Sequence, residues 1–145
     1  MNNVIVTDKT FDPWQAIQHF QNNMQADGQF GACVSFVGTM RDFNENTDVK
    51  KMTLEYYPGM TEKYLTQIIE EAKNKWKIMD AFIVHRVGDF KPGDPIVLVA
   101  TWSAHRAEAY DANRYLIEEL KLRAPFWKKE TLKEGTRWVE HNTPA

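Results

Sequence analysis

Lys121-Leu122-Arg123-Ala124-Pro125-Phe126-Trp127-Lys128-Lys129 is the stretch in which a helical pattern gives way to a strand-like one. Pro125 cannot continue a helix and biases the residue before it towards extended backbone, so it predicts where the preceding helix ends. The stretch also gathers four cations and two large aromatic side chains in a chain whose formal net charge is −2. Cations repel one another, and we interpret their collection beside apolar rings as part of a pocket for an anion.

Outward from this stretch, hydrophobic spacing predicts a mixture of helices and strands. The clearest helix covers residues 61–76, with Glu71 and Lys75 as a solvated ion pair, and another runs from Ser103, its N-cap, to Leu122. Asp12 followed by Pro13 is typical of the start of a third helix. The predicted strands cover residues 4–7, 30–38, 52–57, 81–87, 96–102, 127–132 and 137–140, the last two as a hairpin. Residues 30–38 are predicted to be a buried strand, and residues 39–50 an exposed loop.

Length and composition predict one α+β domain over residues 1–145, because the elements are mixed without repeats or long linkers. The pI of about 6.1 makes general electrostatic attraction to nucleic acid unexpected. We see no signal peptide and no apolar run of membrane-spanning length, so no membrane association is expected. Cys33 is the single cysteine, which excludes an internal disulfide and fits a reducing cytoplasm.

Several basic residues are candidates for binding an anion, and each also has a purely structural interpretation. The candidates are Arg41, His105, Arg106, Lys121 and Lys128. Lys121 can be read as a helix-end lysine that suits the helix dipole, and Lys128 as a solvated strand residue. Their shared neighbourhood favours a functional role, since a partly desolvated lysine beside other cations has a lowered pKa.

His105 and Arg106 lie at a predicted helix start, where free backbone N–H groups and the helix dipole favour an anion. A cation is locally unfavourable there, which suggests a bound phosphate or carboxylate. The alternative is that Arg106 pairs with Glu108 or Asp111 on the surface.

Other residues point less clearly to chemistry. Cys33 lies on an apolar strand and is interpreted as an inert core residue. His85 is interpreted as a hydrogen-bonded strand histidine rather than a ligand. We find no metal-binding or nucleotide-binding motif, and we expect neither a metal nor a cofactor.

Five blocks of sequence, in order, resemble one known family. They are Phe36-Val37-Gly38-Thr39-Met40-Arg41, Leu54-Glu55-Tyr56-Tyr57-Pro58-Gly59-Met60, His85-Arg86-Val87-Gly88, Ser103-Ala104-His105-Arg106 and Lys121-Leu122-Arg123-Ala124-Pro125-Phe126-Trp127-Lys128-Lys129-Glu130. From about residue 30 to residue 140 the chain is similar to the MoaE family, the large catalytic subunits of molybdopterin synthases. The resemblance implies an α+β fold of the α/β-hammerhead type with an additional antiparallel sheet.

The resemblance also implies a sulfurtransferase of molybdenum cofactor biosynthesis. Members of the family transfer sulfur to cyclic pyranopterin monophosphate, and two sulfurs form the dithiolene of molybdopterin. The sulfur arrives as a thiocarboxylate on the C-terminal tail of a small ubiquitin-like subunit, and the large subunits form a homodimer within a heterotetramer. A chain with one cysteine has no internal persulfide relay, which agrees with an external sulfur donor.

By the same resemblance, Lys121 and Lys128 would be catalytic, with Lys121 nearest the thiocarboxylate. The residues implied in substrate binding are Thr39, Met40, Arg41, His105, Arg106, Lys121, Lys128, Lys129 and Glu130. Some members have a lysine where this chain has Thr39, so a phosphate contact at this position would be weaker here.

His105 and Lys121 are sixteen positions apart on one predicted helix, a separation of about 24 Å at 1.5 Å per residue. One small substrate can hardly touch both residues of the same chain. We therefore expect each pocket to combine Lys121, Lys128 and Arg41 of one protomer with the other protomer's copies of His105 and Arg106.

Two other functions are consistent with parts of the sequence. A non-catalytic module that binds a ubiquitin-like tail would have no need for the collected cations. A single-strand nucleic-acid binder would use Phe126, Trp127 and the nearby lysines for stacking and charge. The acidic pI and the lack of an extended basic stripe argue against the second alternative.

Overall fold

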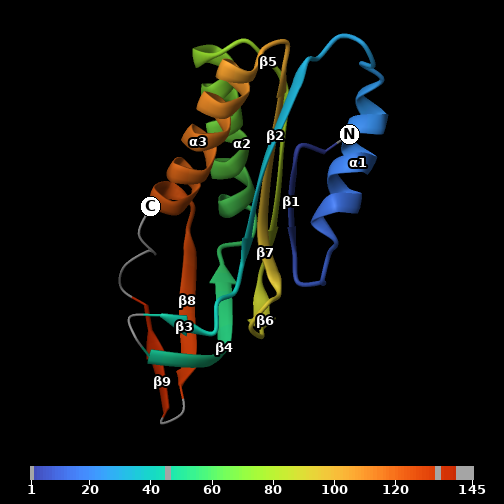
Figure 1. Ribbon diagram of the computed structural model, residues 1–145. Coiled ribbons are helices and arrows are strands. Elements are labelled where there is room, and N and C mark those ends of the chain that lie inside the picture. The colour runs from blue at the N-terminus through green and yellow to red at the C-terminus, as the bar shows by residue number, and fades with distance from the viewer. Residues whose placement is uncertain (1, 45–46, 133–134, 140–145) are drawn as a thin grey trace.

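The chain forms two β-sheets and three helices in this computed structural model, which describes residues 2–44, 47–132 and 135–139 (Figure 1). The helices are α1 (Pro13–Met24), α2 (Met60–Lys75) and α3 (Arg106–Arg123). The strands are β1 (Val4–Thr7), β2 (Ala32–Thr39), β3 (Phe43–Asn44), β4 (Thr47–Tyr56), β5 (Ile78–Arg86), β6 (Gly88–Phe90), β7 (Pro95–Ser103), β8 (Phe126–Leu132) and β9 (Gly135–Trp138).

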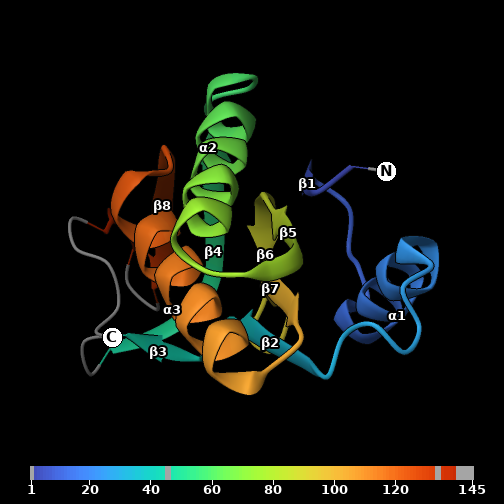
Figure 2. The same ribbon diagram turned by 90° about the horizontal axis from the view of Figure 1, so that it is seen from above.

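The first sheet has the order β1-β5-β7-β2, with β1 parallel to β5 and the other neighbours antiparallel. Helices α2 and α3 lie on one face and α1 on the other (Figure 2). Successive strand residues point to opposite faces, so Ile83 packs under α2 and α3 while Phe82 packs under α1. The central strands β5 and β7 are therefore buried on both faces over most of their length, and the two strands predicted at residues 81–87 and 96–102 are confirmed.

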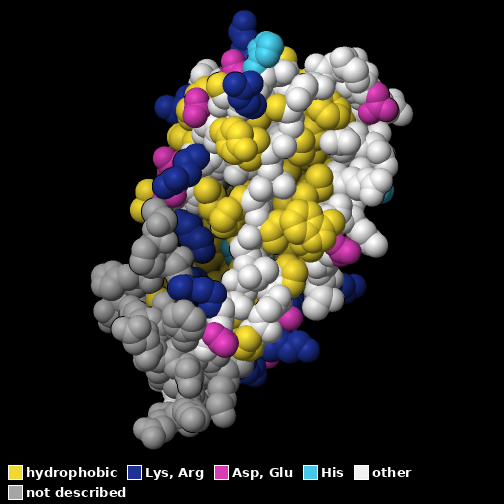
Figure 3. Space-filling model, in the orientation of Figure 1, with side chains coloured by type: hydrophobic (Ala, Val, Ile, Leu, Met, Phe, Trp, Pro, Cys, Tyr) yellow, Lys and Arg dark blue, Asp and Glu magenta, His cyan; other side chains and the backbone are white. Residues whose placement is uncertain are grey.

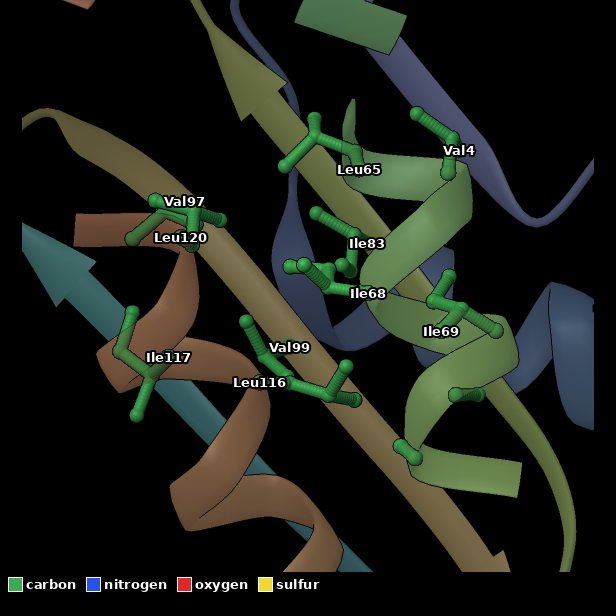
Figure 4. Packing of buried hydrophobic residues seen from close by; sticks show 12 residues of the cluster. Val4, Leu65, Ile68, Ile69, Ile83, Val97, Val99, Leu116, Ile117 and Leu120 are labelled. Carbon is green, nitrogen blue, oxygen red and sulfur yellow. The ribbon is translucent and has the colours of Figure 1, made fainter. Parts of the chain in front are cut away.

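The helix predicted over residues 61–76 is confirmed as α2, and its inward side chains are at most 2% exposed and pack against those of α3 and the sheet (Figure 4). They are Leu65, Ile68, Ile69 and Ala72. The predicted start of α1 is also confirmed, because the Asp12 carboxylate accepts from the Trp14 N–H at 2.9 Å. On the far face Phe20 stacks on Phe82, with ring centroids 4.4 Å apart.

The second sheet has the order β3-β4-β8-β9, with β6 also paired to β4, and every pairing is antiparallel. The mixed helix-and-sheet fold with an additional antiparallel sheet is thus confirmed, as is the predicted hairpin, now formed by β8 and β9. Its tip at residues 133–134, and residue 140, lie outside the described residues. A third apolar cluster joins the two sheets and consists of Met40, Met52, Leu54, Val87 and Phe90.

Three predictions about local environment were wrong. Strand β2 is not buried: it is an outer strand paired only with β7 in the described chain, and Cys33 on it is exposed. Residues 39–50 are not simply a loop, because they contain β3 and the start of β4. Glu71 does not pair with Lys75 in solvent but faces α3, where it binds Arg123. In each case the local sequence pattern could not show which distant segment packs against the residues in question, and that packing decides their environment.

Among the described residues, no helix is long and apolar enough to cross a membrane.

Candidate active site

A cavity of about 390 Å³ lies where the chain passes from the end of α3 into β8 of the second sheet. Its volume is in the range typical of small-molecule sites. The lining residues are Leu54, His85, Ile96, Leu120, Lys121, Leu122, Ala124, Phe126, Trp127, Lys128, Trp138 and Val139. Lys and Arg side chains gather at this level of the surface (Figure 3). The stretch at residues 121–129 therefore does form part of a pocket.

Lys121 reaches the pocket from the last turn of α3. The helix ends at Arg123 because Pro125 cannot continue it, and the Ala124 N–H closes the last turn on the Leu120 carbonyl at 3.2 Å. The Thr61 hydroxyl at the start of α2 donates to the Pro125 carbonyl at 3.1 Å, which fixes the direction of the chain after the helix. Burial, and to a lesser extent the charge of Lys128, lower the pKa of Lys121 to about 8.

Lys128 reaches the pocket from β8, opposite Leu54 on β4. Burial is the main reason why its pKa is lowered; the negative charge of Glu130 opposes this shift and the positive charge of Arg41 adds to it. Two half-buried lysines on different elements thus share one cavity, as predicted from their common neighbourhood.

A network between α2 and α3 holds the helix end that carries Lys121. Glu71 accepts hydrogen bonds from Arg123 Nη1 at 2.6 Å, from Arg123 Nη2 at 3.2 Å and from the Tyr115 hydroxyl at 2.7 Å. Arg123 was counted from the sequence among the clustered cations, but it turns away to α2. Its role is structural, two residues beyond Lys121.

His85 lines the cavity, although the sequence analysis did not count it among the candidate site residues. It is 3% exposed and its Nδ1 lies 2.9 Å from the Arg86 carbonyl, so the prediction of a hydrogen-bonded strand histidine is confirmed. Its place in a block shared with the MoaE family was the available signal.

Residues 39–41 approach the pocket from the end of β2 but do not line the cavity. Thr39 and Arg41 are exposed, whereas Met40 is 5% exposed and belongs to the cluster between the sheets. The backbone of Met40 is tied to the turn before β7 at both of its polar groups. Arg41 acts electrostatically on Lys128, which puts the two cations on the same side of the molecule.

Glu130 is buried within the β8–β9 hairpin, whereas Lys129 is described through its backbone alone. The Glu130 side chain is 3% exposed and accepts a hydrogen bond from Arg137 Nε at 2.9 Å, within the β8–β9 hairpin. The backbone of Lys129 pairs with Thr53 and Trp138 in the sheet, and its side chain lies outside the described part of the structure.

His105 and Arg106 are not brought to the cavity of their own chain. His105, not Ser103, is the N-cap of α3, and the Ser103 hydroxyl donates to the His105 carbonyl. The helix is continuous from Arg106 to Arg123, so His105 and Lys121 are about 24 Å apart along its axis. Both residues at the start of the helix are exposed. Within residues 2–44, 47–132 and 135–139, Arg106 makes no ion pair with Glu108 or any other carboxylate.

The arrangement can bind an anion in a partly dry, aromatic-walled pocket. Two cations near apolar walls attract a negative charge more strongly than they would in water. A lysine whose pKa is near 8 also exchanges its proton near neutral pH. The described residues contain no cluster of three His, Cys, Asp or Glu side chains that could hold a metal.

The family model described as MoaE protein matches residues 6–123. The chain is 49% identical over 137 residues to the molybdopterin synthase catalytic subunit of Pseudomonas aeruginosa, covering 93% of this chain and 88% of that protein. It is 51% identical over 112 residues to the protein of the same name from Ralstonia nicotianae, covering 77% of this chain and 64% of that relative.

A solved structure described as molybdopterin synthase from Staphylococcus aureus has a similar fold. The TM-score is 0.86 at 33% sequence identity, covering 97% of this chain and 99% of that chain.

Proposed function

The chain belongs to the MoaE family, and we propose that it acts as the catalytic subunit of molybdopterin synthase, with the pocket of Lys121 and Lys128 as its reaction site. The observation that carries the proposal is the meeting of these two half-buried lysines in one cavity. Desolvation and mutual repulsion make it costly to bury two like charges, and an anion bound between them offsets that cost.

We propose that the reaction transfers sulfur from the C-terminal thiocarboxylate of a small ubiquitin-like subunit to cyclic pyranopterin monophosphate. The ammonium groups of Lys121 and Lys128 bind the thiocarboxylate anion. When the sulfur attacks the pterin side chain, a C–S bond forms and negative charge moves onto the displaced substrate oxygen, where these ammonium groups stabilise it. Water then cleaves the thioester bond to the tail, which leaves a carboxylate on the small subunit and the sulfur on the pterin. His85 and Phe126 supply the uncharged wall of the same cavity.

The neighbouring residues divide into binding and supporting roles. We assign Arg41, whose charge acts on Lys128, to binding of the substrate phosphate, and Thr39 to a weaker contact beside it. Met40 is buried and shapes the support under them. Glu130 is held by Arg137 and offsets part of the positive charge near Lys128. Lys129 is proposed as a further binding residue on the strength of the family resemblance.

We propose a homodimer in which His105 and Arg106 of one protomer complete the pocket of the other. The continuous helix α3 supports this assignment, since both ends cannot reach one small substrate within a chain. The outer strand β2 leaves a strand edge and the side chain of Phe36, 38% exposed, for a second copy. Hydrophobic side chains gather in the middle of the face shown in Figure 3.

Mixing two inactive variants tests the shared pocket. Lys121→Ala and His105→Ala homodimers are each expected to lack activity, and subunit exchange is expected to restore activity in one of the two pockets of the mixed dimer. Subunit exchange can be followed with differently tagged chains. Proven exchange without any recovery of activity would show that each pocket belongs to one chain.

A reconstituted sulfur-transfer assay tests the proposed reaction. The protein is mixed with a thiocarboxylated small subunit and cyclic pyranopterin monophosphate, and molybdopterin is detected for wild type, Lys121→Ala and the surface variant Lys77→Ala. Product from wild type and Lys77→Ala, with almost none from Lys121→Ala, is the expected result. Binding of the small subunit without product from wild type would favour the non-catalytic module instead.

We propose that the reaction takes place in the cytoplasm, where the Cys33 thiol stays reduced, and fractionation of cells tests this location.

A further inference from the structure

Arg86 is a buried cation for which the proposed reaction has no use. It is the last residue of β5 and is 8% exposed. Its guanidinium donates from Nη2 to the Asp89 carbonyl at 2.9 Å and from Nη1 to Asp94 Oδ2 at 3.3 Å, and it lies 4.6 Å from the centroid of the Phe90 ring. Its buried Nε has no hydrogen-bond partner among the described residues. Burying an arginine is costly even when it is paired, so its position calls for a physical explanation.

The contact of Arg86 with Asp94 connects it to the segment that carries Arg41. Asp94 Oδ2, which binds Arg86, also accepts from the Lys91 N–H at 2.9 Å and so closes the turn before β7. The Met40 N–H donates to the Asp94 carbonyl at 2.9 Å, and the Gly93 N–H donates to the Met40 carbonyl at 2.8 Å. The turn that Arg86 contacts therefore hydrogen-bonds both the backbone N–H and the carbonyl of Met40, the residue directly before Arg41.

The contact of Arg86 with the Phe90 ring connects it to the sheet that carries Lys128. Phe90, which lies against the guanidinium, is opposite Met52 in the pairing of β6 with β4. Two residues further along β4, Leu54 is opposite Lys128 on β8. Arg86 thus contacts β6, which pairs with β4, and β4 in turn pairs with the strand that carries Lys128.

Arg86 spans the two places where the chain crosses between the sheets. The chain passes from β5 to β6 at residues 86–88 and returns to β7 through residues 91–94. A guanidinium offers donors in a fixed planar fork, so it can bind both crossings at once. A flexible apolar side chain would fill the same space without fixing their relative position.

We propose that Arg86 is a positioning residue, which clamps the two crossings through Asp94 and the Asp89 carbonyl and thereby sets Arg41 relative to Lys128. The inference rests on the proposed function, because the geometry it preserves is that of the anion pocket. Displacement of a catalytic group by about 1 Å can lower a rate about 100-fold, which makes such a clamp worth its desolvation cost.

The test compares Arg86→Met, Arg86→Lys and Asp94→Asn with a matched control, Arg114→Met, which removes the exposed ion pair of Arg114 with Glu118. Two quantities are measured: kcat/KM of sulfur transfer, and the pKa of Lys128 followed by NMR of its labelled side chain. The charges facing Lys128 are those of Arg41, Glu130 and Lys121. A core variant, Ile69→Val, controls for a general loss of stability.

We expect Arg86→Met and Asp94→Asn to lower kcat/KM by about 10- to 100-fold. We also expect the pKa of Lys128 to rise, because Arg41 no longer lies close to it. Arg86→Lys retains the charge but not the fork and should fall between wild type and Arg86→Met. Arg114→Met and Ile69→Val should change neither quantity.

A folded Arg86→Met with the Lys128 pKa of wild type and kcat/KM within about twofold would overturn the proposal. If Arg86→Met does not fold, the same two measurements on Arg86→Lys and Asp94→Asn decide the question. If wild type makes no product, the proposed function fails, while the titration of Lys128 still tests the clamp by itself.

Discussion

The imidazole of His85 stacks on the ring of Phe126, with ring centroids 3.9 Å apart and planes inclined by 20°. Because the Arg86 carbonyl only accepts hydrogen bonds, His85 Nδ1 carries the proton and donates it. Burial, and then the charges of Lys121 and Lys128, lower the pKa of His85 to about 3 against the opposing effect of that hydrogen bond. His85 is therefore neutral at physiological pH, whereas Lys121, whose pKa is about 8, titrates near it.

The first prediction concerns the pH dependence of sulfur transfer. Lys121 loses its charge as the pH rises through about 8, so binding of the thiocarboxylate anion should weaken there. We expect kcat/KM, which reports the free enzyme, to fall as the pH rises through this value. Lys128→Met removes a neighbouring positive charge and should raise the pKa of Lys121, which NMR of the labelled Lys121 side chain measures independently of activity.

The measurement is a profile of kcat/KM from about pH 6 to pH 10, a range that brackets the lowered pKa of Lys121. His85→Gln serves as a comparison, because a neutral residue should leave the midpoint near that of wild type even if the rate falls. A kcat/KM that rises through pH 8 would mean that the neutral amine of Lys121 is the active form.

A second prediction is that the pocket is built at the expense of stability. Burial lowers the pKa of Lys121 from 10.5 to about 8, so the charged form is unfavourable in the folded protein at pH 7. Lys121→Met should abolish sulfur transfer and raise the free energy of unfolding by on the order of 2 kcal/mol at pH 7.

The stability difference between Lys121→Met and wild type should also depend on pH, because the pKa of Lys121 differs between the folded and the unfolded chain. Above pH 8 the folded wild type has released the proton that the unfolded chain still holds, so wild type gains stability. The advantage of Lys121→Met should therefore shrink as the pH rises from about 8 towards 10.5. Urea unfolding measures it, with the exposed Lys77→Met as the control; an equal advantage at all pH values would contradict this cause.

The third prediction concerns the network that holds the end of α3. Hydrogen bonds from Arg123 and Tyr115 lower the pKa of Glu71 to about 2. Their contribution is present above the unfolded carboxyl pKa of about 4.3 and is lost as the pH falls through about 2. Glu71→Gln should lower the midpoint of thermal unfolding by a few degrees at pH 7, and the difference from wild type should narrow as the medium is acidified.

Glu118→Gln is the matched control, because Glu118 pairs with Arg114 on the exposed side of α3. Exposed pairs of this kind contribute little, so its midpoint should stay close to that of wild type. Equal effects of the two substitutions would show that the contacts of Glu71 with Arg123 and Tyr115 add nothing special.

The fourth prediction separates buried from exposed leucines on one helix. Leu116 is fully buried between α2, α3 and the first sheet (Figure 4), whereas Leu122 is 77% exposed. Leu116→Ala should lower the free energy of unfolding by about 2–5 kcal/mol. Leu122→Ala should change it by less than about 0.5 kcal/mol. Denaturant unfolding of both variants measures the difference, and similar losses would contradict the orientation of α3.

Much of the fold could be predicted from local patterns. The apolar stripe of α2 has helical spacing, and the cap formed by Asp12 before Pro13 needs only neighbouring residues. The status of β2 could not be predicted this way, because its composition suits a strand buried on both sides while its place at the sheet edge leaves it exposed. Likewise, Glu71 finds its partner Arg123 through the packing of two helices, 52 positions along the chain.

The sequence by itself determined the kinds of elements, the end of α3 shortly before Pro125, and the collection of cations around it. Those features depend on backbone sterics and on residues close in the chain. Only the tertiary structure decided that His85 joins Lys121 and Lys128 in one cavity, and that Glu71 binds Arg123 between α2 and α3. Such neighbourhoods depend on how sheets and helices cross, and that information is spread over distant segments of the chain.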